Sequence, residues 1–200
     1  MKNWLHIKSN DNQVRFLLGV EGKNPMVLMV AYPNMTTPTL WDYQIKTIIK
    51  LSKSLGYDGW MIISIYPQRV KELKYLHAKR HSLMSNRNHA LIKKTIQQYN
   101  IKEIYAGWGS AIENSKFLIQ ELAQMNNTYF NDIKWLAYQN DSAKNHPRSI
   151  VNVPFSFKIK PFDMTAYLEK YLPPTIATQV FAQGRPVRKA NESQPISMAR

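Results

Sequence analysis

Short apolar runs alternate with helical patterns along the first two thirds of the chain. Four runs are almost entirely apolar and lie at Met26–Ala31, Trp60–Ile65, Ile104–Ala106 and Ile133–Ala137. Strands that are buried on both faces show such continuous runs instead of an alternation of apolar and polar residues. We therefore predict four core strands at these positions, preceded by a weaker strand and turn at Gln13–Val20.

Amphipathic segments separate the predicted strands. Apolar residues recur at helical spacing over residues 40–55, 88–99 and 111–125, and Gly56 ends the first of these segments. An alternation of strands and helices implies right-handed crossovers and a parallel sheet. The expected fold is therefore a three-layer α/β domain, in which helices flank a mostly parallel central sheet of about four strands.

A single domain accounts for this pattern. We assign residues 1–172 to it, because neither a repeat nor a linker interrupts them. Residues 173–200 lose the periodicity and gain Pro, Gln, Ser and Arg, so we expect a basic C-terminal tail there.

The amino-acid composition limits the classes of binding partner and the cellular compartment that we expect. The chain has 27 Lys and Arg against 13 Asp and Glu, and this net charge of +14 attracts polyanions. Without cysteine it has no disulfide or thiolate chemistry, which suits a reducing cytoplasm. The longest apolar run, Met26–Tyr32, is too short to span a membrane. We expect a soluble, cytoplasmic protein that binds nucleic acid or a nucleotide, with an acidic protein as the alternative partner.

Polar loops follow each predicted core strand. They lie at residues 32–37, 66–69, 107–109 and 145–149. Ligands of open parallel sheets bind beyond the carboxyl ends of the strands. Because all four loops would meet at that edge, we predict a binding site there.

Several residues of these loops have chemistry that suits an anionic ligand. Gly107 and Gly109 allow the backbone to approach a ligand, although a tight turn alone would also explain them. Trp108 between them is either a stacking platform for a base or a core residue. His146, beside Arg148, is the best catalytic candidate, since histidine donates or transfers protons near neutral pH; the alternative is a loop histidine bonded to backbone.

A strongly basic segment covers residues 69–94, with eight Lys and Arg against one Glu. It predicts a surface that follows a nucleic-acid backbone, and a solvated helix face is the competing interpretation. The residues assigned to this surface are Lys79, Arg80, Arg87, Lys93 and Lys94. His77, His81 and His89 have a spacing that can chelate a metal, but the surrounding cations disfavour one. We expect no metal and no cofactor.

The ordered motifs resemble the bacterial and phage family catalogued as domain of unknown function 1643. The first matching residues are Tyr32-Pro33-Asn34, then Asp42, which opens a predicted helix, and then Gly56-Tyr57. The later ones are Arg69, Trp108-Gly109 and His146-Pro147-Arg148. The resemblance covers about residues 13–172. The sequence departs from the family in its first loop, where Tyr32 replaces an asparagine and Asn34 a serine, and it lacks a second His-Pro after Arg148.

More distantly, the arrangement is similar to the uracil-DNA glycosylase superfamily. This similarity implies that His146 stabilises a departing base anion while a flipped nucleotide occupies the pocket. It further implies that Asn34 or Asp42 positions water, although the acid that such enzymes place after the first strand has no counterpart here. Tyr32, Trp108 and the Gly107–Gly109 backbone would then contact the ligand, and Arg69 and Arg148 its phosphate.

Three functional hypotheses follow, and the third of them rests on the net charge alone. The first is a glycosylase-like protein that hydrolyses an N-glycosidic bond in a nucleic acid or nucleotide. The second is a non-catalytic nucleic-acid-binding module, associated with phage defence or a mobile element, that kept the fold and lost the chemistry. The missing acid favours the second and His146 favours the first. The third hypothesis is a module that binds an acidic protein.

Overall fold

A computed structural model describes residues 3–39, 42–139, 146–150 and 158–173. Its strands form one sheet in the order β1-β2-β4-β3-β5-β6-β7. The strands are β1 (Trp4–Lys8), β2 (Arg15–Val20), β3 (Pro25–Val30), β4 (Gly59–Ser64), β5 (Glu103–Ala106), β6 (Lys134–Gln139) and β7 (Lys158–Pro161). The expected α/β class is confirmed, but the sheet has seven strands where the sequence predicted about four.

The parallel core of the sheet consists of the four predicted core strands. β3 pairs in parallel with β4 on one side and with β5 on the other, and β5 pairs in parallel with β6. Every residue of β3 and β4 is buried, as their continuous apolar runs indicated. The sheet is parallel at its centre, as predicted.

The strands beyond this core are antiparallel. β2 lies within the weaker strand predicted at Gln13–Val20, so the strands that the sequence missed are β1 and β7. β1 and β2 extend the sheet past β4, and β7 pairs antiparallel with β6. β1 and β7 are partly exposed edge strands, and β7 has the sequence Lys-Ile-Lys-Pro. Charged residues and proline protect a sheet edge from further pairing, but they also remove the apolar run by which a strand is recognised.

Four α-helices accompany the sheet in the described part of the chain. They are α1 (Tyr43–Ser54), α2 (Ser82–Gln98), α3 (Lys116–Tyr129) and α4 (Met164–Tyr171), with a short 3-10 helix, η1, at Leu73–Tyr75. The second begins six residues before the prediction, because the His81 side chain caps it by accepting from the Met84 amide. The third begins five residues later than predicted, since turns occupy residues 109–114.

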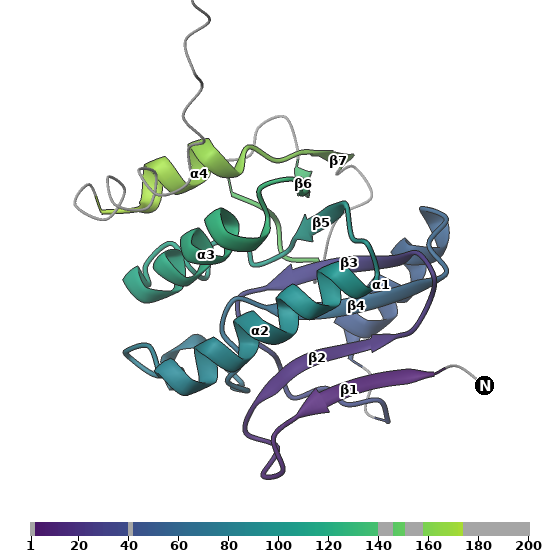
Figure 1. Ribbon diagram of the computed structural model, residues 1–200, viewed down its shortest axis with the longest axis horizontal. Coiled ribbons are helices and arrows are strands. Elements are labelled where there is room, and N and C mark those ends of the chain that lie inside the picture. Colours follow the sequence, from purple (N-terminus) through teal and green to yellow (C-terminus); the bar gives the residue numbers. More distant parts are fainter. Residues whose placement is uncertain (1–2, 40–41, 140–145, 151–157, 174–200) are drawn as a thin grey trace, which may run out of the picture.

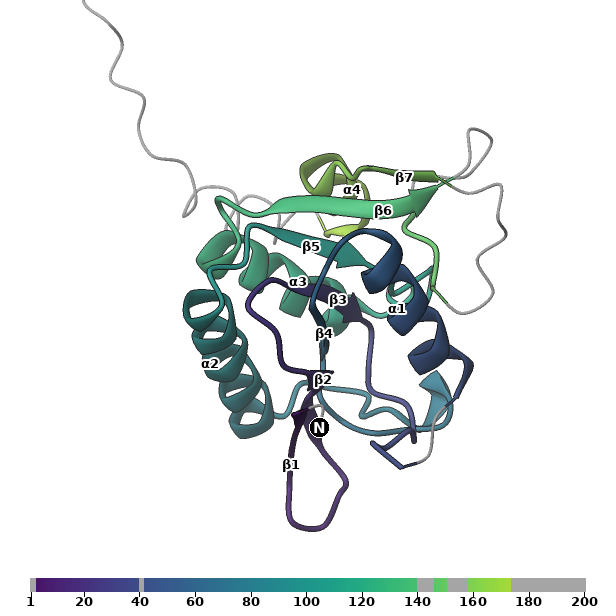
Figure 2. The ribbon, with the colours of Figure 1, turned by 90° about the vertical axis from the view of Figure 1, so that its right-hand side faces the viewer.

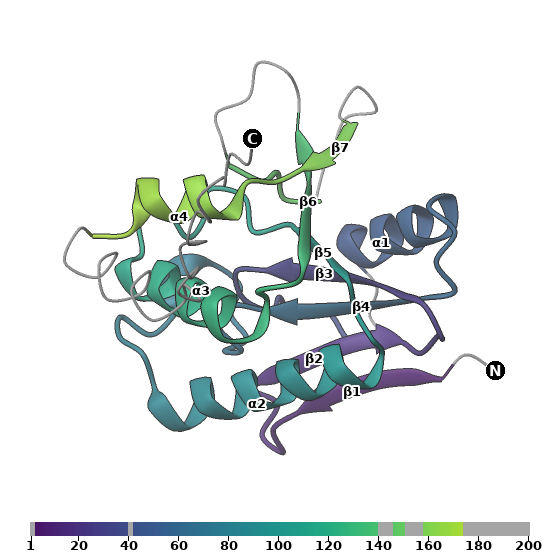
Figure 3. The ribbon, with the colours of Figure 1, turned by 45° about the horizontal axis from the view of Figure 1, so that its top comes forward.

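The helices cover opposite faces of the sheet (Figure 1). Ile45 and Ile48 of α1 pack on one face, against Leu28 of β3 and Ile62 of β4. α2, α3 and α4 pack on the other face, around a second apolar cluster. Figure 2 shows α1 on one side of the sheet and α2 and α3 on the other, and Figure 3 shows α4 beside α3. The expected three layers are therefore present.

The predicted C-terminal tail lies outside the described residues apart from Pro173. Among the helices that the structure describes, none combines the length and apolar character needed to cross a membrane.

Candidate ligand-binding cleft

A cleft of about 500 Å³ opens where the chain reverses its direction of travel across the sheet. From β3 the chain crosses by α1 to β4 on one side, and then by α2 to β5 on the other side of β3. The loops after β3 and β5 therefore diverge to opposite faces and leave a space between them. Tyr32 and Asn34 line this space from the first loop, and Gly107–Ala111 line it from the second.

Side chains from other elements complete the cleft. Gln44 at the start of α1 and Lys71 after β4 line it, and His146, Arg148 and Ser149 line it from the segment after β6. Lys71 and Arg148 are exposed cations, and no carboxylate is among the lining residues that the structure describes. The loops thus meet at one edge of the sheet, as predicted. The cleft there is lined by Tyr32, Asn34, the two glycines, His146 and Arg148.

The glycines of the second loop bring backbone to the cleft. A Cβ on Gly107 would lie 2.6 Å from Leu28 Cδ1, so the loop packs directly on β3. The Gly107 amide donates to the Met29 carbonyl at 2.8 Å, which extends the pairing of β5 with β3. Gly109 has φ +63°, a conformation that favours glycine, and this turn directs the following residues along the cleft wall.

Replacing Gly107 by alanine should lower the free energy of unfolding by about 1–3 kcal/mol, because the new methyl group overlaps a buried leucine. Chemical denaturation would measure the loss. The same substitution in a Leu28→Ala background should cost less, since the overlapping methyl is then absent. Equal costs in the two backgrounds would show that the close approach is not the cause.

Trp108 is a core residue. Its side chain is 3% exposed and packs edge-to-face against Trp135 and Phe162. The indole Nε1 donates to the Tyr167 hydroxyl at 3.2 Å, so the ring is anchored on the α4 side of the sheet. Trp108 lines the cleft, and these ring contacts favour the core residue over the stacking platform.

The Asn34 side chain is the centre of a hydrogen-bond network that shapes the first loop. Its Oδ1 accepts from the Thr36 amide and hydroxyl and from Arg15 Nη2. Its Nδ2 donates to Asp42 Oδ2 and to Gln44 Oε1. Since both ends of the amide are occupied, Asn34 holds the loop and has no polar atom left to orient a water molecule.

Asp42 is bonded through both oxygens as well. Its Oδ1 caps α1 by accepting from the Ile45 amide at 3.0 Å, while Oδ2 accepts from Asn34. An aspartate at this position stabilises a helix by satisfying an otherwise unpaired amide. Asp42 therefore joins the helix to the loop, and a water-activating role for it would require these bonds to break.

Two arginines hold the same loop from beneath. The Thr36 carbonyl accepts from Arg15 Nη1 at 2.6 Å and from Arg69 Nη2 at 3.3 Å. Arg69 also donates to the backbone carbonyls of Asn34 and Asn12. Arg15 and Arg69 are only 2% and 5% exposed. The structure thus places Arg69 below the loop and outside the cleft lining, where it acts on the ligand site through the backbone.

The proximity of these two cations affects their titration. Burial lowers the pKa of Arg15 to about 10, the Arg69 charge acts in the same direction, and Asp42 opposes both. Burial likewise lowers the pKa of Arg69. Arg15 still carries its proton at neutral pH, so the loop encloses two positive charges directly behind the cleft. Their field favours a negative group in front of the loop.

His146 is half-buried and lies next to a carboxylate. Its Nδ1 is 3.6 Å from Glu113 Oε1, and both side chains are less than 20% exposed. Pro147 is buried and the Arg148 amide donates to the Tyr138 carbonyl at 3.3 Å, so the segment is tied to β6. At 3.6 Å the carboxylate is close to the ring but makes no hydrogen bond to it, and Glu113 Oε1 has no hydrogen-bond partner among the described residues.

Sequence reasoning missed several residues of the site. Arg15 lies within a predicted strand and Glu113 within a predicted helix, so neither was considered for the cleft. Gln44 and Lys71 follow the motif residues Asp42 and Arg69 by two positions, and that spacing was the available signal. Contacts between distant segments placed these side chains together, and a single sequence does not contain them.

The basic residues predicted on α2 and before it are divided between several environments. Arg80 donates through Nε to buried Glu121 and through Nη2 to Asn86, so its charge is used within the protein. The Arg87 guanidinium lies 5.1 Å from the centre of the Phe16 ring. Lys79, Lys93 and Lys94 are exposed. Of the five predicted residues, Arg80 is bonded to a buried carboxylate, and the other four, including Arg87, are exposed.

The three histidines considered for a metal have different partners. His77 Nδ1 is 3.1 Å from the Tyr66 hydroxyl, and His81 caps α2. His89 Nε2 is 3.0 Å from Glu121 Oε2. Within the described ranges, no group of three His, Asp or Glu side chains is placed to hold a metal ion.

Comparison with known proteins gives one family. The family model described as "Protein of unknown function (DUF1643)" matches residues 15–148. The matched segment begins with β2, includes the loops that surround the cleft, and ends at Arg148. No curated protein matches the chain.

Proposed function

The chain belongs to the DUF1643 family, whose function is unknown, and from the cleft we propose that it binds a nucleotide, free or as part of a nucleic acid. The position of the cleft is the observation that carries the proposal. It lies at the carboxyl ends of β3 and β5, where the strand order reverses, and this is where open α/β sheets bind ligands that contain phosphate.

The chemistry of the lining supports an anionic ligand. Lys71 and Arg148 supply exposed positive charge, and the Gly107–Ala111 backbone supplies a close surface. Arginine recognises phosphate through several donors at once, and lysine adds a point charge. Tyr32 and Gln44, at the side of the first loop, suit the less charged parts of a nucleotide. A ligand with one charged end and one planar polar end matches this distribution.

Glycosylase chemistry is the second candidate, and the pairing of His146 with Glu113 favours it. In this version the fold is related to the uracil-DNA glycosylase superfamily, and His146 stabilises the departing base. The hydrogen bonds of Asn34 and Asp42 weigh against it, because they occupy the groups that would position water. Binding without catalysis therefore accounts for more of the site, and we place it first.

Neutralising the two lining cations tests the binding proposal. The double variant Lys71→Ala, Arg148→Ala should bind deoxynucleoside monophosphates at least about a hundredfold more weakly than wild type, because charged hydrogen bonds contribute about 1.5–3 kcal/mol each. Isothermal titration calorimetry would measure both affinities.

The double variant Lys93→Ala, Lys94→Ala is the matched control. It removes the same charge from exposed positions on α2, which do not line the cleft. It should bind the monophosphates as wild type does. Equal losses in the two variants would assign the binding to net charge and contradict a site in the cleft.

A further inference from the structure

One face of α1 carries a row of lysines. Lys46, Lys50 and Lys53 follow one another at intervals of four and three residues, and all three are exposed. At 3.6 residues per turn they lie within about 60° of the helix circumference. In the described part of the chain, none of the three takes part in an ion pair. We call this row the α1 ridge.

The packing of α1 explains why the ridge faces outward. Ile45 and Ile48 are fully buried against the sheet, and the lysines occupy the opposite side of the helix. The described helical members of this apolar cluster all come from α1. In Figure 2 this helix stands apart from α2 and α3, which lie across the sheet. Among the residues that the structure describes, no other helix covers the outer side of α1.

The ridge begins near the end of α1 that borders the cleft, on the opposite side of the helix from the cleft lining. Asp42, which caps α1, bonds Asn34, and Gln44 in the first turn lines the cleft itself. Lys46 follows two residues later. A strand that leaves the cleft over the amino-terminal end of α1 would meet the three lysines in sequence.

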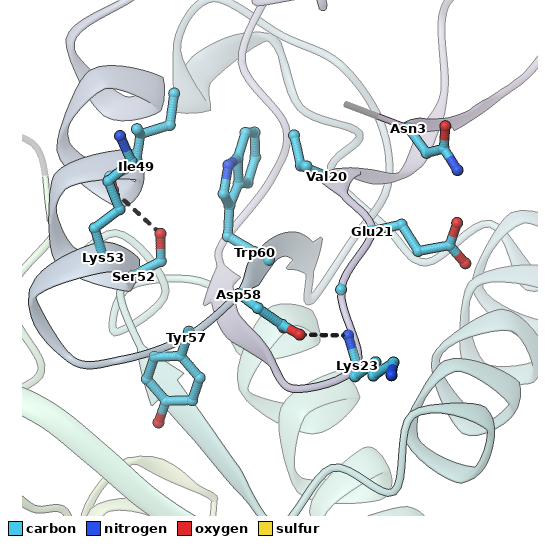
Figure 4. Close-up of a pocket in the computed structure, with 12 residues that line it drawn as sticks. Asn3, Val20, Glu21, Lys23, Ile49, Ser52, Lys53, Tyr57, Asp58 and Trp60 are labelled. Atoms are coloured by element: carbon cyan, nitrogen blue, oxygen red, sulfur yellow. Dashed lines mark hydrogen bonds between the residues drawn. The ribbon is translucent and has the colours of Figure 1, made fainter. Parts of the chain in front are cut away.

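The far end of the ridge reaches a second cavity of about 570 Å³. Figure 4 shows Lys53 on one side of this cavity and Lys23, from the turn between β2 and β3, on the other. Asp58 lies between them, but its two oxygens accept from the backbone amides of Lys23 and Asn24. Glu21 and Asp58 line this cavity together with Lys23 and Lys53, so the lysine charges are balanced there and the α1 ridge ends at Lys53.

We propose that the α1 ridge binds the backbone phosphates of a single-stranded nucleic acid, one nucleotide of which occupies the cleft. This inference rests on the proposed function and specifies its ligand as a polynucleotide strand. A lone helix presents a single line of charges, which matches one strand. A base also has to be unstacked before it enters a cleft, and single strands allow this at the least cost.

The dimensions of the ridge agree with this ligand. Seven residues separate Lys46 from Lys53, which corresponds to about 10 Å at 1.5 Å per residue. Successive phosphates of one strand advance about 3.4 Å along the helix axis in duplex DNA, and further when the strand is extended. The ridge therefore spans about three to four phosphates, enough to place one beside each lysine.

Removing the ridge charges tests the proposal. The triple variant Lys46→Gln, Lys50→Gln, Lys53→Gln is compared with Lys102→Gln, Lys116→Gln, Lys170→Gln, which has the same net charge and alters exposed lysines away from α1 and outside the basic segment at residues 69–94. The probe is a labelled single-stranded DNA of mixed sequence, with fluorescence anisotropy measured over a range of salt concentrations. The slope of log affinity against log salt should fall by about 2 in the ridge variant, since each phosphate contact contributes about 0.7 on a single strand.

The control variant should keep the wild-type slope, and both variants should keep the wild-type affinity for deoxynucleoside monophosphates. Circular dichroism and thermal unfolding would establish that both are folded. If the salt dependence of DNA affinity has the same slope in the two variants, the ridge does not bind the phosphates. Retained binding of monophosphates would show that the cleft still functions in that case. Stronger binding of duplex DNA than of single-stranded DNA would contradict a single-stranded nucleic acid as the ligand. Binding of polyglutamate that depends on the same lysines would contradict it as well. Loss of monophosphate binding in wild type would instead refute the proposed function.

Discussion

Replacing Glu121 by alanine is expected to lower the free energy of unfolding by about 3–5 kcal/mol, the cost of breaking a buried ion pair. Glu121 on α3 is 2% exposed, and its two oxygens accept from Arg80 and from His89. The substitution leaves His89 buried without its partner and releases Arg80, which ties the segment before α2 to α3. Both consequences act on the contact between the two helices.

Urea denaturation at neutral pH would measure this loss. Glu169→Ala provides the matched control, since Glu169 is an exposed glutamate on α4 and its removal should change stability by no more than about 0.5 kcal/mol. A loss as small as that of the control would mean that Arg80 and His89 find other partners or water, and that the buried triad does not fasten α2 to α3.

The stability contributed by Glu121 should also depend on pH. Burial raises the pKa of Glu121, but the hydrogen bonds and charges of His89 and Arg80 outweigh it and hold the pKa below its ordinary value of 4.5. The folded state therefore favours the ionised form, and the contribution is complete above pH 4.5. The difference in stability between wild type and Glu121→Gln should shrink as the pH falls below that value. A difference that is constant with pH would contradict the ion pair.

The core strands were predictable because burial on both faces leaves a continuous apolar run. Pro25–Val30 and Gly59–Ser64 each lie within one residue of the predicted segments. The edge strands were not predictable in this way. Trp4–Lys8 and Lys158–Pro161 form strands because a neighbour pairs with their backbone, and their side chains meet water and core in no regular pattern.

The site was predictable in position and only partly in role. The rule that loops meet at the carboxyl ends of parallel strands brought His146, Arg148, Asn34 and Gly109 to one cleft. The same rule does not show which polar atoms of these residues remain free to contact a ligand. Asn34 is occupied by bonds to residues from several other segments, among them Arg15, which a single sequence does not place beside it.

This distinction bears most directly on His146. Substituting it by alanine should reduce the rate of base release about a hundredfold if the protein is a glycosylase, because removal of a preorganised donor costs about 3 kcal/mol in the transition state. Cleavage of an N-glycosidic bond separates a base anion from a cationic sugar. A donor fixed beside the base is therefore most effective when that charge develops. His146 is the candidate for this donor, since it lines the cleft and its segment is tied to β6 through the Arg148 amide and buried Pro147.

The measurement is abasic-site formation in oligonucleotides that contain deaminated or modified bases. His77→Ala is the control, because His77 is an exposed histidine that does not line the cleft, and its rate should equal that of wild type. Equal rates for His146→Ala and wild type would remove His146 from the mechanism. If wild type binds these oligonucleotides in the cleft but releases no base, catalysis is contradicted for those bases. The bonds that occupy Asn34 and Asp42 would then explain the result, because no water is activated where both groups already serve the fold.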